Sequence, residues 1–110
     1  MSDCISDVED VHHALELACT VTDESDGYWA APAASALAGI VFAASAKGSG
    51  GGVKRARELV AAPDLWPAAA AVCTSEALGQ RLSWAATLDV RQRETVARVM
   101  SGALDRLVAR

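Results

Sequence analysis

Two adjacent histidines, His12 and His13, and three cysteines, Cys4, Cys19 and Cys73, are the side chains most suited to metal binding or nucleophilic chemistry. Adjacent residues on a helix point about 100° apart, so the two imidazoles are poorly placed to chelate one ion together. The spacing of the histidines and cysteines fits no established zinc pattern. We therefore expect solvated histidines, no metal site and no cofactor.

Nucleophilic catalysis is also unexpected. Cys73 lies in an alanine-rich segment that we expect to be buried, and no histidine follows it in the chain to act as a base. The cysteines are odd in number and widely spaced, and residues 1–26 lack the basic start and apolar stretch of a signal peptide. These features predict free thiols and a cytoplasmic location.

The glycine-rich loop that runs from Lys47 to Gly52 raises the question of phosphate binding. A Walker loop needs Gly-Lys followed by Ser or Thr, because the hydroxyl binds magnesium, and a strand must precede it. Here Val53 separates Gly52 from Lys54, and Arg55 follows the lysine. A helix is also predicted before the loop. We interpret it as a flexible connector and expect no nucleotide there.

The large aromatic residues Tyr28, Trp29, Trp66 and Trp84 could stack on single-stranded nucleic acid only if they were exposed among basic residues. Their neighbours are mainly alanine, so we expect them to anchor the core instead.

The basic residues form one group around the third predicted helix and another around the fifth and sixth. If the groups converge in space, they form an electropositive surface for a partner or for DNA phosphates. The alternative is an ordinary solvated surface. The first group is Lys47, Lys54, Arg55 and Arg57, and the second is Arg81, Arg91, Arg93 and Arg98.

Charge divides the chain into two parts. Residues 1–26 contain eight acidic residues and no Lys or Arg, whereas residues 27–110 contain ten basic and six acidic residues. We predict one all-α domain over residues 1–110. Residues 1–26 form an acidic lead-in helix, and residues 27–110 form a mildly basic helical body that carries the working surface.

Composition and periodicity favour helices throughout. The 110 residues are 52% hydrophobic but only 5% aromatic, and alanine, the commonest residue, has the highest helix propensity. No stretch alternates with a period of two. Apolar spacing and capping residues predict six helices, which with their caps span about residues 6–20, 26–46, 53–61, 64–73, 74–86 and 89–108. The expected caps are Ser6, Asp26, Asp64, either Thr74 or Ser75, and Asp89. The expected apolar stripe of the last helix is Val96, Val99, Met100, Ala103, Leu104, Leu107 and Val108.

The second predicted helix is apolar on nearly every side. The uncharged run from Tyr28 to Ala46 is long enough to cross a membrane, but Ala, Ser, Gly and Pro drive insertion weakly. We expect a central helix surrounded by the others. Its small residues at i, i+4 spacing would let a second helix approach closely, and these are Ala31, Ser35, Gly39 and Ala43. The predicted fold is a compact bundle of five to six helices around this alanine-rich helix.

Several segments together resemble a known family. They occur in the order Asp7-x-Glu9-Asp10, Asp26-Gly27-Tyr28-Trp29, Ala38-Gly39-Ile40-Val41-Phe42-Ala43-Ala44, a glycine-rich loop, and Val60-x-x-Pro63-Asp64-Leu65. The chain is similar, over about residues 5–108, to the all-α domain inserted in the motor domain of actinobacterial type IV secretion coupling proteins. These are hexameric DNA-transfer ATPases that deliver relaxase–DNA or protein substrates to a secretion channel.

The resemblance implies a docking role and lends no catalytic residue. Walker A and Walker B motifs are missing here, so ATPase activity and hexamer formation would belong to a parent protein attached to the inner face of the membrane. The implied partner is a protein substrate or a relaxosome component, with DNA as a further candidate and no membrane contact by this domain. The alternative is a free-standing helical protein that binds DNA or regulates a partner.

Overall fold

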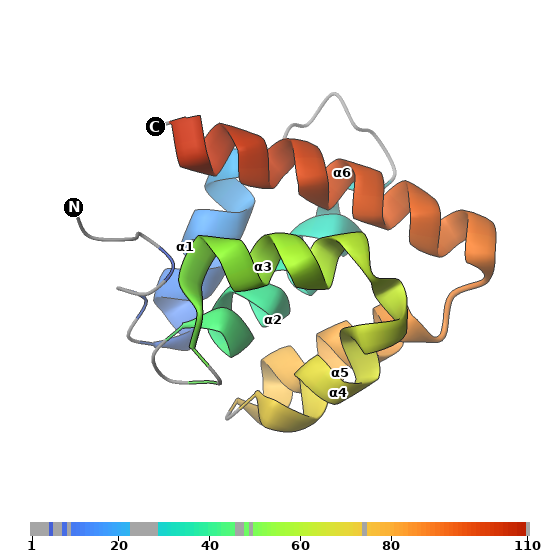
Figure 1. Ribbon diagram of the computed structural model, residues 1–110, viewed down its shortest axis with the longest axis horizontal. Helices are drawn as coiled ribbons and strands as arrows, with labels where there is room; N and C mark the ends of the chain where they lie inside the picture. The colour runs from blue at the N-terminus through green and yellow to red at the C-terminus, as the bar shows by residue number, and fades with distance from the viewer. Residues whose placement is uncertain are drawn as a thin grey trace.

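A computed structural model of the chain describes residues 5, 8, 10–22, 29–45, 48, 50–73 and 75–109. Within these residues the structure is all-α and contains no strand, which confirms the predicted fold class (Figure 1). The elements are α1 (Val11–Val21), α2 (Ala30–Ala44), α3 (Gly52–Ala61), the 3-10 turn η2 (Pro63–Leu65), α4 (Trp66–Val72), α5 (Glu76–Ala86) and α6 (Val90–Ala109).

Helix α2 is the central element, as predicted. Eleven of its fifteen residues are buried, and it packs against α1, α3, α4, α5 and α6. Figure 1 shows it passing through the middle of the bundle, behind α3. Pro32 falls in its first turn, where the missing N–H costs no helical hydrogen bond. In the described part of the chain, no helix combines the length and apolar character needed to span a membrane.

The small residues of α2 allow the close approach that their spacing predicts. A Cβ atom on Gly39 would lie 3.0 Å from the carbonyl oxygen of Leu78 and 3.1 Å from the Cβ of Leu82. Both of these residues belong to α5 and are fully buried. The backbone of α2 therefore contacts α5 directly at Gly39, and there is little space for a side chain.

Glycine is needed for a different reason where the connector enters α3. Gly50, Gly51 and Gly52 have φ angles of 80°, 100° and 61°. Residues with a Cβ atom rarely adopt this left-handed region. These glycines therefore reverse the chain so that α3 can pack back against α2.

Two predicted caps are confirmed. The hydroxyl of Ser75 accepts a hydrogen bond from the backbone N–H of Leu78 at the start of α5. The carboxylate of Asp89 accepts one from the N–H of Gln92 at 2.8 Å at the start of α6. Side-chain caps of this kind satisfy backbone donors that have no partner within the helix.

Other predicted helix starts are wrong. Helix α1 begins at Val11, not Asp7, because the carboxylate of Asp10 accepts the N–H of His13 at 2.8 Å and caps the helix there. Helix α4 begins at Trp66 after the turn η2, and Asp64 makes no capping hydrogen bond. The predicted caps Ser6 and Asp26 lie outside the described residues.

The tryptophans do not all behave as predicted. Trp66 is fully buried, and its Nε1–H donates a hydrogen bond of 2.8 Å to the carbonyl of Leu59. Trp84 is 48% exposed, so the prediction of a core role is wrong there, because it faces away from the buried side of α5. Trp29 is half-buried, and Tyr28 lies outside the described residues.

The long C-terminal helix α6 follows its predicted apolar stripe. Its buried side chains are Val96, Met100, Ala103, Leu104 and Leu107, whereas Arg91, Glu94, Arg98, Ser101 and Asp105 are exposed. Val108, predicted for the apolar face, is 46% exposed. From the same helix, Arg106 Nε donates to the carbonyl of Val21 at 2.6 Å and so satisfies the C-terminal end of α1.

We predict that Trp66→Phe lowers the free energy of unfolding by about 1–3 kcal/mol. The buried carbonyl of Leu59 loses the shorter of its two hydrogen bonds and keeps the one from the N–H of Ala62 at 3.2 Å, and the smaller ring leaves a cavity in the core. The matched change Trp84→Phe, at an exposed position, should cost less than about 0.5 kcal/mol. Urea unfolding followed by circular dichroism gives both values. Equal losses for the two variants would contradict the assigned role of Trp66.

Gly39→Val should destabilise the bundle by about 1–3 kcal/mol, because the added atoms collide with α5. The control is Gly102→Val on α6. Apart from the backbone of α6 itself, the one described atom within 4 Å of an added Cβ there is the Nη1 of Arg106 at 3.9 Å. This change should alter stability by less than about 0.5 kcal/mol. A Gly39 variant as stable as the control would show that α2 and α5 are not in close contact.

Candidate functional site

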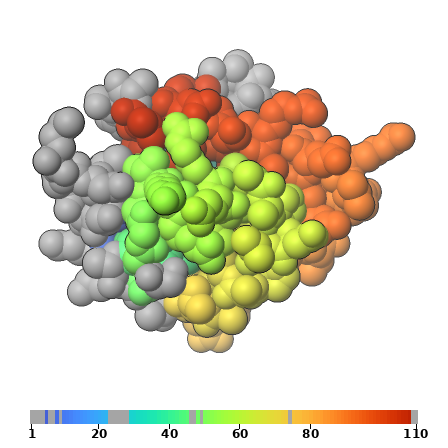
Figure 2. Space-filling model, in the orientation of Figure 1, coloured from blue at the N-terminus to red at the C-terminus, as the bar shows by residue number. Residues whose placement is uncertain are grey.

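A groove of about 760 Å³ lies between α3 and α6. The two helices run antiparallel and side by side on the face seen in Figures 1 and 2, and the turn η2 closes one end. From α3 and the turn, the lining residues are Arg57, Val60, Ala61, Pro63 and Asp64. From α6 they are Val90, Arg93, Glu94, Ala97, Arg98, Ser101 and Leu104. We call this feature the α3–α6 groove.

The lining of the α3–α6 groove follows from helical periodicity. Val90, Arg93, Ala97, Ser101 and Leu104 are separated by three or four residues, so they share one face of α6. This face stands beside the buried stripe of the same helix. The groove therefore has an apolar floor where it meets the core and charged side chains toward solvent.

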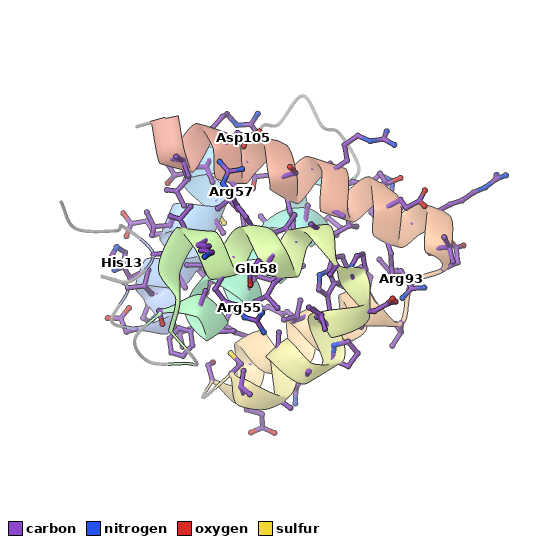
Figure 3. All side chains as sticks on the ribbon, viewed as in Figure 1. His13, Arg55, Arg57, Glu58, Arg93 and Asp105 are labelled. Carbon is purple, nitrogen blue, oxygen red and sulfur yellow. The ribbon has the colours of Figure 1, made fainter. Side chains whose placement is uncertain are left out.

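An ion pair bridges the two helices beside the groove. The guanidinium of Arg57 lies 2.8 Å from the carboxylate of Asp105, and Figure 3 shows the two side chains reaching toward one another from α3 and α6. Within α3, Arg55 pairs with Glu58 at 3.2 Å. All four side chains are 40% exposed or more, so each pair adds at most about 1 kcal/mol to stability. The pairs do, however, neutralise two of the predicted basic residues.

Arg93 is in a different situation. Its side chain is only 25% exposed, and its nearest carboxylate, Asp64, is 3.9 Å away with a side chain that is 97% exposed. This separation is too long for a hydrogen bond. The Nε atom of Arg93 is buried and has no hydrogen-bond partner among the described residues. Arg93, at the N-terminal end of α6 in Figure 3, is therefore an incompletely satisfied cation within the groove.

The eight predicted basic residues do not form one patch. Arg57, Arg93 and Arg98 converge on the α3–α6 groove, together with the carboxylates of Asp64 and Glu94. Arg98 is exposed and has no ion-pair partner in the described part of the chain. The other basic residues lie elsewhere. Neither of the two grooves described here is lined by Lys54, Arg55 or Arg91. Arg81 lines the second groove, and Lys47 lies outside the described residues. The charge of the α3–α6 groove is thus mixed.

The second groove, of about 600 Å³, lies between α2 and α5. Trp84, Arg81 and Pro32 line it, with Ala31, Ser35, Ala77 and Gln80. Sequence reasoning assigned Trp84 to the core and so missed this surface. The available signal was the spacing of Trp84 from Ala77, Gln80 and Arg81, which places all four on one face of α5, away from Leu78 and Leu82.

The candidate metal and thiol residues remain separate. In the residues that the structure describes, no three His, Cys, Asp or Glu side chains gather to hold a metal ion. Cys19 is exposed and Cys73 half-buried, and both are free thiols. Burial raises the pKa of Cys73, although a backbone hydrogen bond involving Ser75 opposes the shift. A raised pKa disfavours the nucleophilic thiolate. Cys4 lies outside the described residues.

Comparisons of the chain with protein-family models, with curated proteins and with solved structures found no match.

The raised pKa of Cys73 gives a pH prediction. Alkylation requires the thiolate, so its rate in the folded chain should rise at a more alkaline pH than that of Cys73 in the urea-unfolded chain. Mass spectrometry of the peptide that contains Cys73, after timed iodoacetamide treatment across pH, measures both profiles. A folded-state midpoint at or below the unfolded one would show that burial does not govern this thiol.

Proposed function

We propose that this chain binds a protein substrate in the α3–α6 groove, as the substrate-recognition domain of a type IV secretion coupling protein. The observation that carries the proposal is a groove with an apolar floor and mixed charged walls between two well-packed helices. An apolar centre with a polar rim is the usual organisation of a protein–protein interface, and arginine is enriched there.

The position of the groove suits docking. Both of its helices pack on the buried helix α2, and the ion pair between Arg57 and Asp105 joins them at the surface. Binding sites on helices packed in this way lose little conformational freedom when a partner binds. We assign the groove to a coupling-protein domain because the ordered sequence segments resemble that domain.

In this proposal the chain performs recognition and no chemistry. The ATPase motor and the hexamer belong to a parent protein at the inner face of the membrane, and the domain stands on the cytoplasmic side. Its partner is a relaxosome component or a secreted protein, and the groove selects this partner for transfer.

Direct DNA binding is the second candidate, and one observation favours it. The exposed Trp84 lies in the same groove as Arg81, and an aromatic beside a cation can stack on a base and contact a phosphate. The α3–α6 groove is less suited to DNA, because the carboxylates of Asp64 and Glu94 lie among its arginines. With Arg57 paired to Asp105, the remaining positive and negative charges of the lining balance, so a polyanion gains little net attraction there, whereas a protein can match both signs of charge.

The test introduces a tryptophan at either of two exposed serines. Ser101→Trp fills the α3–α6 groove, and Ser83→Trp places the same side chain on α5 outside both grooves. We expect the immobilised chain to capture a relaxase, an accessory protein or a secreted protein from lysate of conjugating donor cells. The Ser101 variant should lose this capture and the Ser83 variant should retain it.

Recovery of none of these protein classes by the unmodified chain would overturn the proposal. An anisotropy titration with labelled single-stranded DNA over a salt series tests the second candidate. Tight binding that weakens steeply with salt would indicate phosphate contacts and would favour DNA over a protein substrate.

A further inference from the structure

We infer that the α3–α6 groove takes a segment of the partner protein in which one carboxylate is flanked by apolar side chains, and that this carboxylate binds Arg93. The inference deepens the proposed function, because it names the chemistry of the partner for the same groove. It rests on the state of Arg93, on the balance of charge around it, and on the apolar residues next to it along α6.

Among the residues that the structure describes, the Nε of Arg93 has no acceptor and the guanidinium has no close carboxylate. Its side chain is three-quarters buried, its Nε is buried without a hydrogen-bond partner, and the only ion-pair partner described is Asp64 at 3.9 Å. The carboxylate of Asp64 is almost fully exposed, so water screens its attraction. A carboxylate that enters the groove would supply an acceptor to the exposed part of the Arg93 side chain, and arginine binds carboxylates through two parallel hydrogen bonds.

The surrounding charge selects a group with a single negative charge. Glu94 lines the same groove one residue after Arg93, and Asp64 lies at the turn beside it. A phosphate carries nearly twice the charge of a carboxylate and is repelled more strongly by these acids. The other two arginines of the lining offset this repulsion little, because Arg57 is paired with Asp105 and Arg98 lies five residues after Arg93 on α6. A single carboxylate can pair with Arg93 and is repelled less by Asp64 and Glu94. The groove therefore favours an acidic side chain over a phosphorylated one.

Apolar residues adjoin Arg93 on both sides. Val90 precedes it by three residues and Ala97 follows it by four, so the three residues share one face of α6. Val90 is 59% exposed, and Ala97 is partly buried against the core. A bound segment with apolar side chains on either side of its carboxylate would cover both. An isolated anion would leave them uncovered.

The experiment uses two short fluorescent peptides that differ at one residue. In the first a single glutamate is flanked by leucines, and in the second glutamine replaces that glutamate. Anisotropy with the full chain should show binding of the glutamate peptide and binding of the glutamine peptide that is weaker by about tenfold. In ¹⁵N NMR spectra, the Nε–H signal of Arg93 should shift with the glutamate peptide only.

Three variants locate the contact. Arg93→Gln should remove the preference for glutamate, whereas Arg91→Gln, at an exposed position on the same helix outside the groove, should keep it. Asp64→Asn leaves Arg93 in place and removes the competing carboxylate, so it should strengthen binding of the glutamate peptide. This gain keeps the inference testable if Arg93→Gln proves unstable by circular dichroism.

Equal binding of the two peptides, or equal effects of the Arg91 and Arg93 variants, would overturn the inference. A phosphoserine peptide that binds more tightly than the glutamate peptide would also overturn it. The proposed function is tested separately. If Arg93→Gln captures transferred proteins as well as the unmodified chain does, the inference fails and the proposed function stands. If glutamate-selective binding is found but no transferred protein is captured, the proposed function fails instead.

Discussion

The burial of α2 on nearly all sides is the constraint on which the rest of the structure depends. A helix of small and apolar residues without charge is stable in water only when other helices surround it, and α1, α3, α4, α5 and α6 all contact it. Because its side chains are small, the neighbours lie close, and at Gly39 the backbone of α2 lies against α5. The bundle therefore obtains its core from tight helix packing more than from large aromatic side chains.

The α3–α6 groove is a consequence of this arrangement. Helices α3 and α6 both bury one face against the core, so their neighbouring outer faces meet at the surface. The turn between α3 and α4 closes one end of the groove, and the buried Trp66 holds that turn through its hydrogen bond to Leu59. Arg93, whose side chain is three-quarters buried, reaches the same end from α6. The docking surface that we propose thus lies where packing leaves a cation without a close partner among the described residues.

Local sequence signals predicted the helices well, because apolar spacing and the side-chain caps Ser75 and Asp89 act within a few residues of each other. These local signals were wrong where the same residues are compatible with more than one local structure. Asp64 precedes a proline-containing helix in the manner of a cap, yet the chain forms a 3-10 turn there. The convergence of Arg57 with Arg93 depends on how α3 and α6 face one another. Sequence periodicity alone does not supply this information.

The central claim is that partners bind in the α3–α6 groove, and site-specific photo-crosslinking tests it most directly. A photoreactive residue replaces Ser101 in the groove or, as a control, Ser83 on α5, and the chain is irradiated in donor cells during transfer. Our account predicts that the Ser101 position crosslinks to a transferred protein, through a peptide that contains an acidic residue among apolar ones, and that Ser83 does not. Crosslinks to that protein from Ser83 alone, or crosslinks from Ser101 to DNA, would contradict it.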